Sequence, residues 1–217
     1  MLPIIELKNI TLGYEAALPI LQNFSCKIMS GETIHLTGDN GCGKSTLLKL
    51  LNGLLLPQHG QYIFQGIEIN REFLRQQLPA KAFHQKMGYL WQKPEAQLFC
   101  NTVEEELAFG PIQMDLPISE IQQRVQDTIK LLGITHLRQR TPYTLSGGEQ
   151  KKTAIGAILT MNPQIWILDE PMNDLDRQSQ DWLIDFLTSL KAAGKTIIFT
   201  SHHQQLNQIA DRCIYLK

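Results

Sequence analysis

The sequence predicts an α/β fold in which helices cover a largely parallel sheet. Short apolar segments typical of buried strands alternate with stretches of helical periodicity, as in proteins built from strand–helix–strand units. A glycine-rich turn at residues 38–45 joins one strand to a helix. A second apolar strand, at residues 165–168, ends in the adjacent acids Asp169 and Glu170. Two carboxylates at the end of a buried strand are costly unless they face a cation or a cleft.

The individual elements follow from the hydrophobic pattern. Alternating runs between residues 4 and 36 indicate a strand-rich N-terminal lobe, and leucines at helical spacing predict a helix over residues 45–55. The rest of the chain predicts strands at 61–69 and 86–91, helices over 103–109, 118–132, 147–161 and 178–193, and strands at 165–168 and 196–200. We expect one domain, residues 1–217, with a helical insertion at about residues 95–160.

Composition excludes several classes of protein. The chain has 217 residues, 43% of them hydrophobic and 19% charged, which is ordinary for a globular protein. A net charge of -1 provides no broad basic field, so no nucleic-acid partner is expected. The four cysteines are widely spaced, which suggests neither a zinc site nor a disulfide framework and fits a reducing cytosol. No segment approaches the roughly 18 apolar residues of a membrane span.

The stretch TGDNGCGKSTL, residues 37–47, matches the phosphate-binding pattern G-x-x-x-x-G-K-[ST] between a strand and a helix. Glycines let backbone N–H groups wrap phosphates, the helix directs its positive end at them, and Lys44 adds a charge on the β and γ groups. Ser45 is expected to ligate Mg²⁺. The predicted nucleotide-binding residues are Gly38, Asp39, Asn40, Gly41, Cys42, Gly43, Lys44, Ser45 and Thr46.

The acids after the second strand fit the same chemistry. With a phosphate loop elsewhere in the sheet, Asp169 is the expected partner of Mg²⁺, and Glu170 is the candidate that polarises the attacking water. The alternative is a pair of helix N-cap residues, which Asp and Glu often supply. The phosphate loop favours the first interpretation.

Three motifs in order make this chain similar to the ATP-binding cassette (ABC) ATPases. TGDNGCGKST resembles their Walker A motif, LSGGEQ at residues 145–150 their signature, and IWILDEP at residues 165–171 their Walker B. Gln92 corresponds to the Q-loop glutamine, a catalytic and metal-binding position, and His202 in FTSHH to the switch histidine, a catalytic position. The resemblance implies a P-loop NTPase with a RecA-like parallel core, an N-terminal antiparallel β lobe, a helical subdomain, and ATP and Mg²⁺ as cofactors.

The resemblance also implies a partner. In ABC proteins the signature of one subunit closes on the ATP of the other, so a second ABC ATPase subunit, identical or a paralogue, is expected. The nucleotide-contacting residues of the signature are then Ser146, Gly147, Gly148 and Glu149. Tyr14 matches the position that stacks on adenine, although a lone aromatic of this kind can equally belong to the core. Asn173 and Asp174 depart from the small residues usual near the subunit seam.

The segment WQKPEAQLFCNTVEEELAFGP, residues 91–111, is similar to the region after the Q-loop in ATPases of energy-coupling factor (ECF) importers. There the Q-loop and helical subdomain meet integral membrane subunits. Leu98, Phe99 and Phe109 with the acids at residues 104–106 predict either an apolar groove rimmed by acid or a helix with a solvated acidic face. Trp91 and Trp166 are expected in the core.

The expected function is ATP hydrolysis that drives an importer, at the cytoplasmic face of the cell membrane. The ECF resemblance implies a transition-metal ion such as cobalt or nickel, or a vitamin such as biotin, as cargo. The alternatives are a soluble ABC ATPase acting on nucleic acid or the ribosome, and a P-loop kinase. Tandem cassettes, long insertions and basic tails would favour the first alternative, and LSGGEQ argues against the second.

Overall fold

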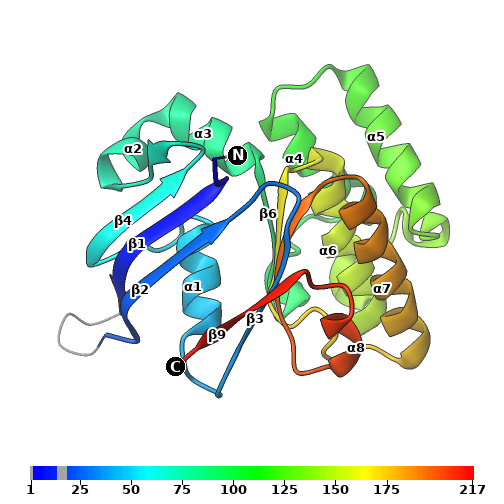
Figure 1. The fold of residues 1–217 in the computed structure, drawn as a ribbon. Helices are drawn as coiled ribbons and strands as arrows, with labels where there is room; N and C mark the ends of the chain where they lie inside the picture. Colours follow the sequence, from blue (N-terminus) through cyan, green and yellow to red (C-terminus); the bar gives the residue numbers. More distant parts are fainter. Residues whose placement is uncertain (1, 14–18) are drawn as a thin grey trace.

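The computed structural model describes residues 2–13 and 19–217 and contains two sheets of different kinds (Figure 1). The N-terminal sheet is antiparallel, in the order β2 (Leu21–Ile28), β1 (Ile5–Leu12), β4 (His59–Phe64) and β5 (Ile67–Glu68). The central sheet is parallel, in the order β6 (Met87–Leu90), β7 (Ile165–Leu168), β8 (Thr196–Thr200), β3 (Thr33–Gly38) and β9 (Arg212–Leu216). The predicted α/β class, with its antiparallel lobe, is confirmed.

Helices cover both faces of the parallel sheet. The helices of the described residues are α1 (Lys44–Leu51), α2 (Arg71–Arg75), α3 (Gln77–Gln85), α4 (Val103–Gln113), α5 (Ile118–Leu131), α6 (Gly147–Met161), α7 (Arg177–Ala192) and α8 (Gln204–Asn207), of which α1 covers one face and α6 and α7 the other. Single turns of 3₁₀ helix lie at Pro94–Ala96 (η1), Thr135–Leu137 and Pro142–Thr144. Among the residues described, no helix combines the length and apolar character that a bilayer span requires.

Strand β7 takes part in two hydrophobic cores. Ile165 and Ile167 pack into the core that α1 shares with the antiparallel sheet, whereas Trp166 and Leu168 pack into the core beneath α6 and α7. This division follows from the period of two in a strand, which sends successive side chains to opposite faces. Because all four residues are buried, the strand end that carries Asp169 is held from both sides.

A third core lies in the part of the chain predicted as a helical insertion. Val103 and Leu107 of α4 pack against Val125 and Ile129 of α5 and against the following loop. Helix α6 lies beside α4 and α5 but also contributes Ala154, Ile155 and Ile158 to the core of the parallel sheet. It therefore connects this helical layer, at the right of Figure 1, with the central sheet.

Several elements differ from the sequence-based expectation. The pattern missed β9, an edge strand whose side chains are mostly exposed, and the short helices α2, α3 and α8. Strand β3 belongs to the parallel sheet rather than to the N-terminal lobe. The prediction for Trp166 is correct, but Trp91 is 42% exposed, because β6 ends at Leu90 and the chain leaves the sheet there.

The three carboxylates at the start of α4 have separate environments, so the run forms neither a continuous acidic rim nor a fully solvated face. Glu104 pairs with Arg138, and Glu105 accepts a hydrogen bond of 3.1 Å from the backbone of Asn101. Glu106 is buried, and its Oε2 accepts hydrogen bonds of 2.9 and 2.8 Å from the amides of Phe99 and Cys100. The carboxylates thus hold the helix start and the preceding loop, and of the three only Glu106 also lines the apolar groove formed with Phe99 and Phe109.

Replacing Glu106 tests this structural role. We expect Glu106→Ala to lower the free energy of unfolding by about 2–4 kcal/mol, because two partly buried amides lose their acceptor. Glu106→Gln retains an acceptor oxygen of similar reach and should lose less than half as much. Urea denaturation of the two variants measures the difference, and equal stability of Glu106→Ala and the parent protein would show that water replaces the carboxylate.

Candidate functional site

The phosphate loop runs from the end of β3 into α1, and its glycines are required by geometry. Gly38 has φ +145°, and a Cβ there would lie 2.4 Å from the carbonyl oxygen of Leu216. Gly43 has φ +100°, and its Cβ would lie 2.5 Å from Cγ2 of Ile20. Since Gly43 is also the N-cap of α1, the tight turn brings the helix N-terminus to the loop, where unpaired N–H groups favour an anion.

Lys44 places its charge inside this loop. Its Nζ donates hydrogen bonds of 2.7 Å to the carbonyl oxygen of Gly38 and 3.0 Å to that of Asp39. The side chain therefore folds back over the loop from the first position of α1. An ammonium beside exposed backbone N–H groups is a cradle for phosphate oxygens.

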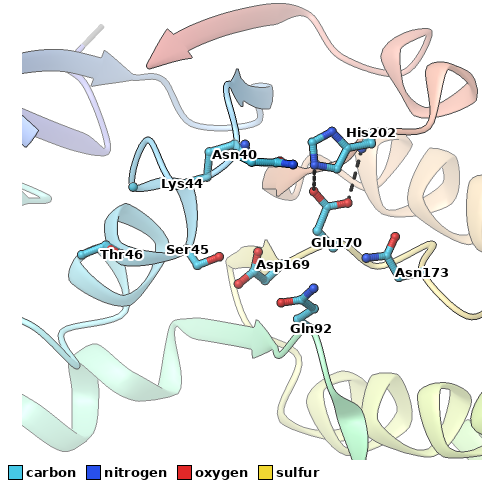
Figure 2. A pocket seen from close by; sticks show the side chains of 11 residues that line it. Asn40, Lys44, Ser45, Thr46, Gln92, Asp169, Glu170, Asn173 and His202 are labelled. Atoms are coloured by element: carbon cyan, nitrogen blue, oxygen red, sulfur yellow. Dashed lines mark hydrogen bonds and ion pairs between the residues drawn. The ribbon is translucent and has the colours of Figure 1, made fainter. Parts of the chain in front are cut away.

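Most of the predicted catalytic and binding residues line one cavity of about 410 Å³ (Figure 2). The loop supplies one wall, Gln92 follows β6, Asp169 and Glu170 follow β7, and His202 follows β8. These positions converge because the carboxyl ends of parallel strands meet at one edge of a sheet. The lining residues are Asn40, Gly41, Gly43, Lys44, Ser45, Thr46, Gln92, Asp169, Glu170, Asn173 and His202.

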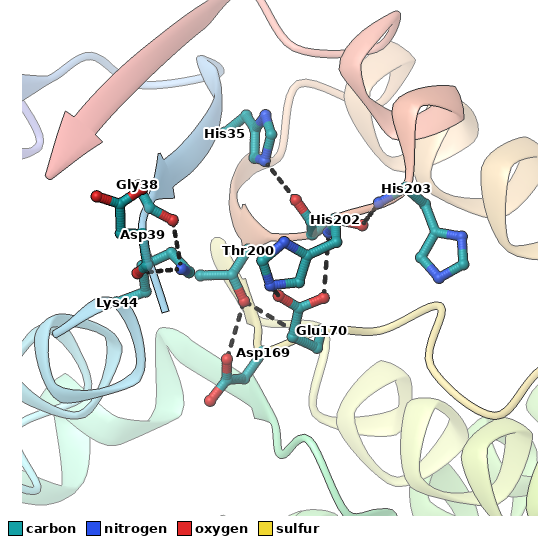
Figure 3. A network of polar contacts seen from close by, with 10 residues as sticks. His35, Gly38, Asp39, Lys44, Asp169, Glu170, Thr200, His202 and His203 are labelled. Carbon is teal, nitrogen blue, oxygen red and sulfur yellow. Dashed lines mark hydrogen bonds and ion pairs between the residues drawn. The ribbon is translucent and has the colours of Figure 1, made fainter. Parts of the chain in front are cut away.

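Thr200 joins the two acids and was not among the predicted residues. Its Oγ1 donates a 2.8 Å hydrogen bond to Oδ1 of Asp169 and accepts one of 2.9 Å from the backbone N–H of Glu170 (Figure 3). Its place at the end of β8, beside the strand that carries the acids, is the signal that could have identified it. The hydroxyl fixes the carboxylate of Asp169 toward the cavity.

Glu170 and His202 already contact each other. The imidazole Nε2 of His202 lies 3.2 Å from Oε1 of Glu170, and the backbone N–H of His202 donates to Oε2 at 3.3 Å. The Nε2 contact has an ion-pair distance without hydrogen-bond geometry, so the buried Oε1 receives no hydrogen bond from the described residues. The backbone of Glu170 has φ +47°, an uncommon conformation for a residue other than glycine. Because Oε1 is buried against the imidazole, another donor can reach it only by displacing that ring.

A metal ion has suitable donors in the same cavity. Ser45, Gln92 and Asp169 present a hydroxyl, an amide oxygen and a carboxylate toward one point in Figure 2. This set contains only hard oxygen donors and leaves room for water and phosphate ligands, as Mg²⁺ prefers. Behind the cavity, His35 stacks on Phe199 and bonds the carbonyl oxygen of Ser201 at 3.0 Å, and burial lowers the pKa of its imidazole.

The predicted signature residues lie in a different cleft. Ser146, Gly147, Gly148 and Glu149 line a cavity of about 400 Å³ together with Lys152, Asp174, Asp176 and Ser179. Ser146 caps α6, and Glu149 accepts a 2.8 Å hydrogen bond from its N–H, which lowers the pKa of that carboxyl. A Cβ at Gly147 would meet no atom within 4 Å. The helix start therefore faces open space, and the structure does not bring it to the phosphate loop of the same chain.

Comparison with known proteins shows which family has both the nucleotide cavity and the signature cleft. Residues 21–173 match the family described as ABC transporter. The chain belongs to the ABC transporter family. It is an ATP-binding subunit of this family, an ATPase, and the similarity to ATP-binding proteins extends along most of its length.

Two curated relatives show how far the similarity of this ABC ATPase reaches. A putative ABC transporter ATP-binding protein of Clostridium acetobutylicum is 43% identical over 198 residues, which cover 91% of this chain and 82% of the relative. The nickel import ATP-binding protein LarO of Lactiplantibacillus plantarum is 42% identical, with 97% of this chain and 87% of the relative covered.

Solved structures support the same fold. CbiO1 of Clostridium perfringens, described as part of the ABC transporter complex cbiONQ, superposes with a TM-score of 0.86 at 30% identity and covers 100% of this chain and 86% of its own. The cassette MJ0796, solved as a dimer with ADP and Pi, gives a TM-score of 0.86 at 27% identity, with coverages of 98% and 94%. Tyr14, the expected adenine-stacking residue, lies outside the described residues of this ABC ATPase.

Proposed function

We propose that this chain is the ATP-hydrolysing subunit of an ECF-type importer and acts at the cytoplasmic face of the membrane. The relatives include an ECF transporter ATP-binding protein of Methanospirillum hungatei at 40% identity and nickel import proteins at 42% and 38%. These names support a transition-metal ion such as nickel or cobalt as cargo, with a vitamin such as biotin as the other candidate. Selection of the cargo is a task for the membrane subunits.

Within one subunit, Lys44 and the loop amides hold the phosphates of ATP, and Thr46 completes this cradle. Ser45, Gln92 and Asp169 would hold Mg²⁺, which would supply charge neutralisation to the phosphates. Glu170, whose carboxylate lines the cavity with Oε1 against His202, accepts a proton from the attacking water. His202, beside the same oxygen, donates to the γ-phosphate. The common position of these residues around one cavity supports the proposed roles.

A second subunit completes the site. The exposed start of α6 presents Ser146, Gly147 and the half-buried Gly148 away from its own phosphate loop. Helix N-termini bind anions, so this surface suits the γ-phosphate held by another copy of the chain or a paralogue. The dimeric ADP-bound structure of MJ0796 supports this arrangement.

The observation that carries the importer proposal is an apolar groove of about 310 Å³ between α3, α4 and α6. Phe99 and Phe109 line it, pack edge to face at 4.8 Å between ring centroids, and are 66% and 41% exposed. Met114, Met161 and Ala157 complete its apolar wall. Large exposed aromatic residues around a hollow are typical of a protein interface. The groove begins a few residues after Gln92, so a partner seated there can act on the nucleotide site.

Co-purification tests the proposal. The membrane subunits encoded beside this chain are co-expressed with it, and we expect Phe99→Asp to reduce their recovery by about tenfold or more, since a charge in an apolar groove must be desolvated. Ile67→Asp is the control, because Ile67 is equally apolar and exposed but lies on β5. Equal recovery with both variants would contradict docking in the groove. A stable nucleic-acid complex in place of membrane subunits would favour the soluble alternative.

A further inference from the structure

Lys151 is a lysine in an unusual environment. It lies in the second turn of α6 and is only 2% exposed, although lysine is among the residues least often buried without a partner. Its Nζ donates a 2.7 Å hydrogen bond to the backbone carbonyl oxygen of Asn173. Burial lowers the pKa of the ammonium, and the carboxylates of Asp174, Glu95 and Glu170 oppose that effect. Because the buried ammonium of Lys151 bonds to one turn of the chain, we expect it to have a specific role there.

The turn that Lys151 contacts is strained at both ends. Glu170 has φ +47° and Asp174 has φ +61°, and neither is glycine. Such conformations each cost on the order of 1–3 kcal/mol and persist only where surrounding contacts fix them. Asn173, between them, lines the nucleotide cavity, whereas Asp174 lines the cleft of the signature residues. The turn thus forms part of both sites at once.

The carboxylates around Lys151 belong to two separate segments. Glu95 lies in η1, which follows Gln92 and packs against α6. Glu170 and Asp174 are the two ends of the strained turn that follows β7. The helix that carries Lys151 begins with the exposed signature residues. The ammonium therefore stands where the loop after Gln92, the catalytic strand end and the signature helix meet.

We infer that Lys151 is a positioning residue, which holds the turn at residues 170–174 so that Asn173 faces the nucleotide and Glu170 faces the attacking water. Because Lys151 moves with α6, displacement of the signature helix on contact with a second subunit is transmitted to Glu170 through the Asn173 carbonyl. This inference rests on the nucleotide site of the proposed function but goes beyond it, since Lys151 contacts neither nucleotide nor metal in that proposal. It requires no membrane partner.

Lys151→Met tests this role in the purified ATPase. Methionine keeps an apolar stem of similar length, and replacing a buried charge by an apolar group is often neutral for stability. We expect kcat to fall by about tenfold to a hundredfold, because misplacement of a reacting group slows chemistry without weakening binding. The KM for ATP should stay within about twofold of the parent value. The melting temperature should stay within a few degrees of that of the parent protein.

Lys195→Met is the matched control. Its Nζ also donates to a backbone carbonyl, that of Pro163 at 2.9 Å, and burial likewise lowers its pKa. It precedes β8 and therefore lies at the end of the sheet opposite the nucleotide site. This variant should retain the parent kcat.

Two results would overturn the inference. The first is parent kcat in Lys151→Met, and the second is a joint loss of kcat, nucleotide affinity and melting temperature, which would assign Lys151 to the fold alone. If Lys151→Met does not fold, Lys151→Gln replaces it in the comparison of kcat, KM and melting temperature. Glutamine is polar but too short to reach Asn173. A failure of the importer proposal can be distinguished from a failure of this inference. The importer proposal is tested by the recovery of membrane subunits, and its outcome does not change the kcat expected for Lys151→Met.

Discussion

Glu170→Gln is expected to lower kcat for ATP hydrolysis by about a hundredfold to ten-thousandfold, the usual contribution of a general base. The amide has the shape of the carboxylate but cannot accept a proton from water. The substitution also alters the 3.2 Å contact with the His202 imidazole, while the N–H of His202 keeps an oxygen acceptor. Binding of ATP should persist, because the phosphate loop is untouched. Steady-state turnover and the affinity for a non-hydrolysable ATP analogue measure the two effects.

The same variant should accumulate as a dimer in ATP, since closure is no longer followed by hydrolysis. Light scattering with and without ATP detects this change in mass. Glu68→Gln is the control, because Glu68 is an exposed carboxylate on β5. Parent turnover in Glu170→Gln would remove Glu170 from the proposed role, whatever the dimer measurement shows.

Gly147→Glu is expected to lower hydrolysis by about a hundredfold without harming the fold. A Cβ at this position meets no atom within 4 Å, and acidic residues in the first turn of a helix are favourable by about 0.3–1 kcal/mol. The melting temperature should therefore stay equal or rise. The new carboxylate would face the γ-phosphate of the other subunit, and like charges brought together across an interface cost several kcal/mol. Turnover as a function of protein concentration measures the loss.

Gly147→Ala separates charge from size at the same position. Alanine adds a methyl group into open space, so its turnover should exceed that of Gly147→Glu by at least about tenfold, in line with the charge repulsion. ATP binding by single subunits should be equal in the parent and both variants. If Gly147→Glu hydrolyses ATP at the parent rate, the signature face does not close on a nucleotide.

The sequence was most informative where backbone geometry demands particular residues. Glycines at 38 and 43 are needed because any side chain would collide with Leu216 or Ile20, so the phosphate loop is visible as a motif. The centre of the parallel sheet was predictable because β7 and β8 are buried on both faces and read as short apolar runs. The convergence of Gln92, Asp169 and His202 then follows from the meeting of the strand ends.

Features that depend on tertiary contacts were not predictable. Trp91 looked like core because it extends an apolar run, yet the strand ends one residue earlier. Glu106 looked like part of a solvated charge run, yet it turns inward to two backbone amides. Thr200 stands out only once β8 is paired beside β7, and Lys151 carries no local signal, because their partners lie 31 and 22 residues away. Their functions become apparent only when separate elements are placed together.

The packing of β7 into two hydrophobic cores restricts which parts of this protein can unfold locally. The core of α4 and α5 is separate from the two cores that hold β7, so the helical layer can fluctuate or exchange its amide protons without the sheet. Exposure of Asp169 by contrast requires both sheet cores to separate together. Local opening of the α4–α5 core therefore leaves the reacting groups in place, whereas a displacement of α6, which also packs on the sheet, reaches them.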